Sequence, residues 1–120
     1  MGSPVLILLR SADWESRFEA TTLAVTAAAL GDRVQIALFG EALRAWIAGR
    51  FDEGAPGGAA SLGSLAEALE EGRRDLGVEV VACDTAIRVA GLEVEAVRPR
   101  VDAVRSLPQI WQQGGRVLAF

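Results

Sequence analysis

The sequence predicts an α/β protein with three layers, α/β/α, around a mostly parallel five-stranded sheet. Short apolar runs alternate with segments of helical spacing along the whole chain, which is the pattern of a parallel sheet with helices on both faces. The first run, PVLILL at 4–9, is continuously apolar, as expected for a central strand buried on both sides. At 120 residues the chain has the length of one domain, so we expect a single domain over 1–120.

Four further strands are predicted after the first. Each is a short run rich in Val, Ile, Leu or Ala and is bounded by Gly or charged residues. The fourth strand along the chain, 101–107, has the weakest apolar pattern. These predicted strands lie at 33–39, 78–83, 101–107 and 116–120.

A long helix is predicted from Trp14 to Leu30, where Gly31 ends it. Ser11 or Asp13 can cap its start with a side-chain oxygen. From 20 to 30 the helix carries almost no charge on any face, and a helix that is apolar all round is buried all round. A helix flanking a sheet covers the sheet with one side only, so we expect the other side to meet another subunit.

The middle of the chain alternates a short helix, a loop and a longer helix. A short helix after Gly40 places its apolar residues on one face, and residues 51–63, with four glycines and one proline, predict a mobile loop. Ser64 and Glu67 predict a capping box, and Glu70 and Arg74 an outward i,i+4 pair. The apolar residues expected to face the core are Leu43, Trp46 and Ile47, then Leu65, Leu69 and Leu76.

Composition excludes several kinds of chemistry. The chain has no His and no Lys, and all 12 basic residues are Arg, so histidine triads, lysine Schiff bases and a phosphate-binding P-loop lysine are excluded. One Cys with carboxylates makes a poor metal site, and no cofactor is expected. With a net charge of -4 and no basic stripe we expect no nucleic-acid partner, and with only short apolar runs no membrane span. Because 4–9 is too short for a signal peptide, we expect a cytoplasmic protein.

Cys83 is the candidate reactive residue. It follows the predicted strand 78–83 and precedes a short helix that ends at Gly91, where the first N–H groups and the helix dipole favour a thiolate. Asp84, Thr85 and Ala86 would present those N–H groups. The Asp84 carboxylate opposes a thiolate, and Arg88, one turn on, is placed to compensate. The alternative is that Cys83 is a small buried hydrophobe, as free cysteines often are.

A second kind of site is possible at the same edge of the sheet. Ser11 and Asp13 follow the first strand, Phe39 and Gly40 end the second, and Cys83 ends the third. Open α/β sheets bind ligands at the carboxyl ends of their strands. The sequence therefore also permits a small-ligand pocket lined by these residues, which predicts thermal stabilisation by the ligand.

The order of elements, with the segment VEVVACDTAIRVAGL beginning at Val78, resembles the DsrE/TusD-like small sulfur-relay proteins of the DsrE/DsrF/DsrH superfamily. The resemblance spans nearly the whole chain and implies a DsrE-like fold. It further implies a homo-oligomer such as a trimer or hexamer, and a possible sulfurtransferase that carries sulfane sulfur as a persulfide on Cys83 between a donor and an acceptor protein. The alternative is a non-catalytic oligomeric DsrE-like binding or scaffold protein in which Cys83 is structural.

Overall fold

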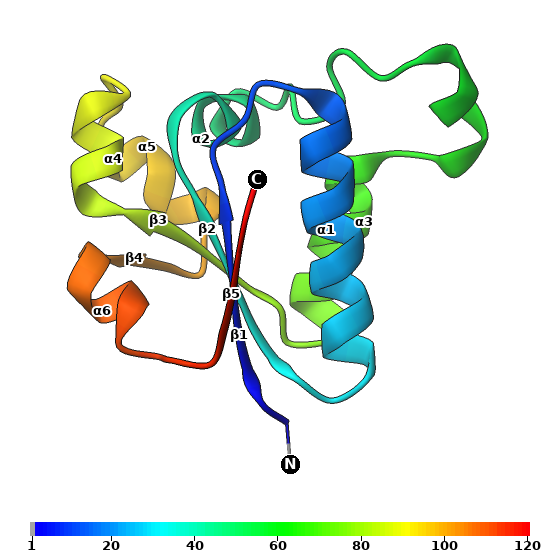
Figure 1. Cartoon of the computed structure of the whole chain (residues 1–120). Helices are drawn as coiled ribbons and strands as arrows, with labels where there is room; N and C mark the ends of the chain where they lie inside the picture. The colour runs from blue at the N-terminus through cyan, green and yellow to red at the C-terminus, as the bar shows by residue number, and fades with distance from the viewer. Residues whose placement is uncertain (1) are drawn as a thin grey trace.

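The computed structural model describes residues 2–120 and confirms the predicted α/β/α architecture (Figure 1). Its five strands are all parallel and lie in the order β4-β3-β2-β1-β5. All five predicted strands are present, and the fourth is shorter than predicted because Ser106 already caps the next helix. The strands are β1 Pro4–Leu9, β2 Arg33–Leu38, β3 Glu79–Cys83, β4 Ala103–Arg105 and β5 Arg116–Ala119.

The chain order of the strands explains which face each helix covers. From β1 to β4 every crossover steps in the same direction across the sheet, whereas the step from β4 to β5 returns past three strands. Since parallel crossovers are right-handed, the return puts its helix on the opposite face. Five helices, α1 Trp14–Ala29, α2 Gly40–Ile47, α3 Leu65–Asp75, α4 Asp84–Val89 and α5 Val94–Val97, pack into one apolar core, and α6 Leu107–Trp111 packs into the other.

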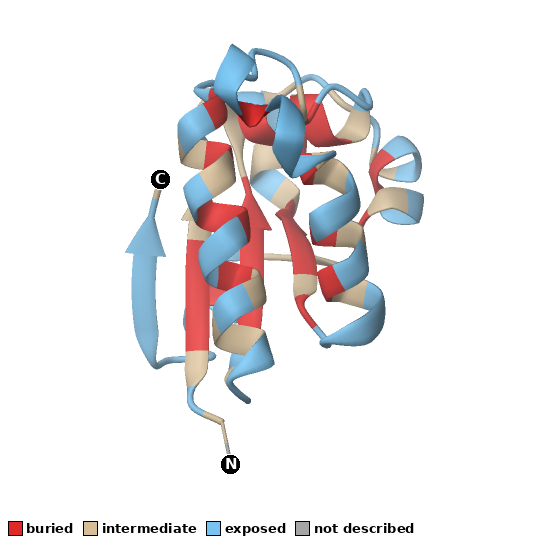
Figure 2. Ribbon diagram, turned by 90° about the vertical axis from the view of Figure 1, so that its right-hand side faces the viewer, coloured by how far each residue is buried: buried red, intermediate tan, exposed pale blue. Residues whose placement is uncertain are grey.

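The two cores differ greatly in size. On β1, Val5, Ile7 and Leu9 face the α1 side and Leu6 the α6 side, as the period of two in a strand requires. Figure 2 shows buried residues concentrated in the central strands, with β5 exposed at the edge. The face opposite α1 is therefore covered by a single short helix.

Several local predictions are corrected by the structure. Ser64 accepts a hydrogen bond from the Glu67 N–H, but no return bond from the Glu67 side chain forms within the described chain. The second cap of α3 is Asp52, whose carboxylate accepts from the Leu65 N–H at 2.5 Å and from the Ser64 hydroxyl at 2.7 Å. The sequence pattern missed this cap because Asp52 is twelve residues from Ser64.

The outward pair on α3 is also different from the prediction. Glu70 pairs with Arg73 at 3.1 Å rather than with Arg74, because the Arg73 guanidinium also bonds Asp102 at 3.0 Å. Burial lowers the pKa of Arg73, but bonds to Asp102 and Glu70 outweigh it and raise the pKa above its usual value. Leu76, expected in the core, is partly exposed at the helix end.

The glycine-rich segment 51–63, predicted to be a mobile loop, carries a regular element and buried residues. It contains the 3-10 helix η1, Gly57–Leu62, and buries Phe51 and Ala59. A second 3-10 helix, η2 Arg98–Arg100, follows α5. Between residues 2 and 120 no helix combines the length and apolar character needed to cross a membrane.

Candidate functional site

The carboxyl ends of the central strands meet at one edge of the sheet, as predicted. Cys83 at the end of β3 and Phe39 after β2 pack in the same apolar cluster, together with Ala86 of α4. Cys83 faces the α6 side with Val81, because alternate residues of β3 point to alternate faces. Of the predicted site residues, the structure thus brings together Cys83, Phe39 and Ala86.

The side chain of Cys83 is buried, with 3% of the residue exposed. Its cluster is formed by Leu6, Ala37, Val81 and Ile110. Within residues 2–120 no hydrogen bond reaches the sulfur, and although Cys83 is the N-cap of α4, its side chain accepts none of the helical N–H groups. The sulfur thus lies among apolar side chains and makes none of the helix-capping bonds that the sequence position suggested.

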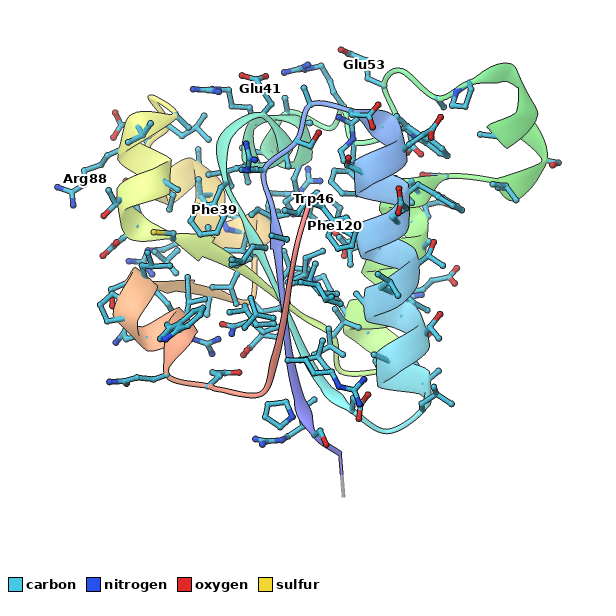
Figure 3. The ribbon with its side chains drawn as sticks, viewed as in Figure 1. Phe39, Glu41, Trp46, Glu53, Arg88 and Phe120 are labelled. Carbon is cyan, nitrogen blue, oxygen red and sulfur yellow. The ribbon has the colours of Figure 1, made fainter. Side chains whose placement is uncertain are left out.

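The polar residues beside Cys83 are directed elsewhere. Asp84 Oδ1 accepts from the Thr85 N–H at 2.6 Å and from the Thr85 hydroxyl at 3.3 Å, so this N–H is already used. Arg88 is exposed, and Figure 3 shows it pointing outward from α4, away from Phe39. The predicted compensation of Asp84 by Arg88 is not seen, since no ion pair joins them in the described residues.

A polar network that joins β4, β3 and β2 beside Cys83 was not predicted from the sequence. Arg105 is the register partner of Cys83 on β4, and its guanidinium bonds both oxygens of Glu79 at 2.7 and 2.8 Å and Gln35 Oε1 at 2.8 Å. The bond to Glu79 raises the pKa of Arg105. Gln35 Nε2 donates to the carbonyl oxygen of Ile110, so the network fastens α6 to the sheet. The sequence signal that could have indicated this network is Gln35, a polar residue within the apolar run 33–39.

The residues expected after β1 have local structural roles. Asp13 caps α1 by accepting from the Ser16 N–H at 3.3 Å, and Ser11 Oγ accepts from the Asp13 N–H at 2.9 Å. Gly40 has φ +52°, and a Cβ there would lie 3.3 Å from the Arg10 carbonyl oxygen. The close passage of the β1 and β2 ends therefore favours glycine at position 40.

Five well-defined cavities in residues 2–120 are lined by residues other than Ser11, Asp13, Phe39 and Cys83. One of them adjoins the ends of β1 and β2, where Ala12 and Glu41 line it. The largest, about 580 Å³, is an open hollow at the amino ends of the strands, crossed by the Arg73–Asp102 pair. Two others adjoin Trp14 on α1. No cluster of three or more Cys, Asp or Glu that could hold a metal ion occurs in residues 2–120.

Comparison with known proteins supports the fold and no function. No protein-family model matches the chain, and no curated protein matches it either. Among solved structures, the chain is similar to a conserved protein of unknown function from Bacteroides thetaiotaomicron, with 14% identity, 98% of this chain and 95% of that chain covered, and a TM-score of 0.67. At this identity the likeness shows the fold alone, so the resemblance to DsrE/TusD-like proteins stays a prediction.

Proposed function

We propose that this protein is a non-catalytic binding or scaffold protein that assembles into a homo-oligomer, with Cys83 as a packing residue. The observation that carries the proposal is the burial of Cys83 among Leu6, Ala37, Val81 and Ile110. A sulfur that must meet a partner's thiol needs an open approach and a stabilised anion. Cys83 is 3% exposed, and in the described residues its side chain accepts no hydrogen bond from the helix that it precedes.

Exposed apolar side chains support an assembly. Leu23 on α1 and Leu30, the C-cap residue of α1, are exposed, as expected for a side of the helix that does not cover the sheet. The edge strand β5 also leaves Val117 and Leu118 partly exposed. An edge with unpaired backbone groups and no charge between Arg116 and Phe120 is open to pairing with another chain. The DsrE-like resemblance implies a trimer or hexamer, and the short first apolar run, 4–9, favours a cytoplasmic location.

Sulfur relay through Cys83 is the second candidate. One observation favours it: Cys83 ends a central strand at the carboxyl edge of the sheet, where parallel sheets place their ligands. The thiol is separated from solvent mainly by α6, a helix of five residues, and by the half-buried Phe39. Relay would then require α6 to move aside when a donor protein docks.

Intact-mass analysis after exposure to a low-molecular-weight persulfide separates the two candidates. The binding or scaffold role predicts no added sulfur on the folded protein, whereas unfolded chain gains one sulfur at Cys83. Rapid stoichiometric addition to the folded protein, absent in Cys83→Ala, would establish relay chemistry instead. Alanine is the better control because serine would bury a hydroxyl without a partner among apolar side chains.

A further inference from the structure

Two adjoining hollows surround Trp14 at the first turn of α1. One, about 180 Å³, lies between α1 and residues 62–68, and the other, about 510 Å³, lies beneath the arch formed by residues 52–64. Trp14, Gly63 and Ser64 line both. Figure 1 shows this arch projecting from the end of the α1–α3 pair.

The packing of α1 against α3 explains the position of the smaller hollow. At Gly72, α3 lies so close to α1 that a Cβ there would stand 3.2 Å from Val25 Cγ2. Toward Trp14 the space between α1 and Leu65 is not filled by side chains, and the hollow remains. Its α1 wall is formed by one stripe of the helix: Trp14, Phe18, Thr21, Thr22, Val25 and Thr26.

Two polar atoms in this wall have no partner. Trp14 Nε1 and Thr21 Oγ1 are the buried side-chain nitrogen and oxygen atoms without a hydrogen bond in residues 2–120, although Trp14 is 8% exposed and Thr21 1%. Buried polar groups are almost always paired, and an unpaired one calls for an explanation. The indole of Trp46 is paired, since it donates to the Arg100 carbonyl oxygen at 2.7 Å. Both unpaired atoms thus belong to residues that line the smaller hollow.

We propose that the smaller hollow is a binding site for a neutral ring compound that carries a carbonyl oxygen. No charged side chain lines it, so an ionised ligand would lose its hydration without compensation. A cavity of about 150 Å³ holds a benzene ring, so 180 Å³ suits one ring with a small substituent. The Trp14 N–H is the donor for the carbonyl. This N–H has no partner in residues 2–120 and belongs to a residue that lines the hollow.

Acetophenone and ethylbenzene test this site, since they have similar shapes and only the first has an acceptor oxygen. Each is titrated into 15N-labelled protein while the three indole N–H signals are followed. Acetophenone should shift the Trp14 signal saturably and bind roughly fivefold to tenfold more tightly than ethylbenzene, the gain of about one net hydrogen bond. The signal of Trp46, already bonded to Arg100, should stay nearly unchanged, as should that of the exposed Trp111.

Two variants distinguish loss of the site from misfolding of the protein. Trp14→Phe keeps a ring but removes the donor, and it should abolish the preference for acetophenone. Ala68→Phe plugs the hollow from α3, where Ala68 is exposed, and should remove binding while the Trp14 indole remains to report it. No saturable shift, equal shifts of all three indoles, or full binding in Ala68→Phe would each overturn the site. The test does not involve Cys83, so its outcome is independent of the role proposed for that residue.

Discussion

At the scale of single residues, Arg17 is the buried charge that holds the segment after α2 against α1. Its guanidinium donates to three backbone carbonyls, those of Ala12 at 2.8 Å, Phe51 at 3.1 Å and Glu53. Burial lowers the pKa of Arg17, while the nearby carboxylates of Glu53, Asp13 and Asp52 raise it. The planar guanidinium of arginine carries five N–H donors and can bond three carbonyls at once, whereas the compact ammonium of lysine is not suited to this.

Arg17→Lys should therefore destabilise the protein although it keeps the charge. A single ammonium cannot reach all three carbonyls, and unpaired buried acceptors should lower the free energy of unfolding by about 2 kcal/mol. Urea denaturation measures this change. Arg74→Lys is the control, because Arg74 is exposed beside Asp75 and surface changes stay within about 0.5 kcal/mol. Equal effects of the two substitutions would show that the carbonyl contacts are unimportant.

Local residue patterns predicted caps and missed the long-range bonds. The Asp13 cap of α1 follows from spacing within one helical turn, and it is present. The Asp52 cap of α3 and the bonds of Arg17 to Phe51 and Glu53 join residues 12 to 36 apart in the chain. Such pairs depend on how segment 51–63 folds back, which no local spacing encodes.

At the scale of elements, the turn before β5 depends on two glycines with different surroundings. Gly115 has φ +85°, and a Cβ there would lie 2.1 Å from the Pro4 carbonyl oxygen. Gly114 has φ +67° and open space around it. Both positions favour glycine by conformation, but only Gly115 is also required by the close approach of β5 to β1.

Gly115→Ala should accordingly cost more stability than Gly114→Ala. The left-handed conformation costs about 1–2 kcal/mol for alanine at either position, and the clash at Gly115 adds to it or displaces β5. Urea denaturation gives the total, and hydrogen exchange of the Val117 to Ala119 amides shows whether β5 leaves the sheet. Retention of β5 protection with the same stability loss in both variants would contradict the steric argument.

The sequence predicted the helices and strands well because their residue patterns are local. It predicted less well those features that depend on contacts between distant parts of the chain. The apolar runs correctly placed all five strands and the short helix after Cys83. Segment 51–63 was expected to be a mobile loop because of its glycines, and the burial of Phe51 and Ala59 in the larger apolar core was not foreseen. Position at a strand end predicted a reactive Cys83, but the side of β3 on which it lies, and the cover from α6, come from the topology.

At the scale of the whole molecule, the outer side of α1 should mediate self-association. Leu23→Glu combined with Leu30→Glu places charges on two exposed apolar positions of α1 and should shift sedimentation-velocity profiles toward monomer. Val89→Glu is the control, because Val89 is also apolar and exposed but lies on α4, on the other side of the molecule (Figure 1). A monomeric wild-type protein, or equal effects of all substitutions, would refute an α1 interface.

A packing role for Cys83 predicts a thiol that reagents reach slowly, and the rate of alkylation measures this. Native protein and protein in 8 M urea are treated with iodoacetamide at neutral pH and followed by intact mass. Because Cys83 is 3% exposed, we expect labelling of the folded protein to be at least about 100-fold slower, limited by opening of the structure. If the folded protein were labelled as fast as the unfolded chain, or faster, Cys83 would be an accessible thiolate and not a packing residue.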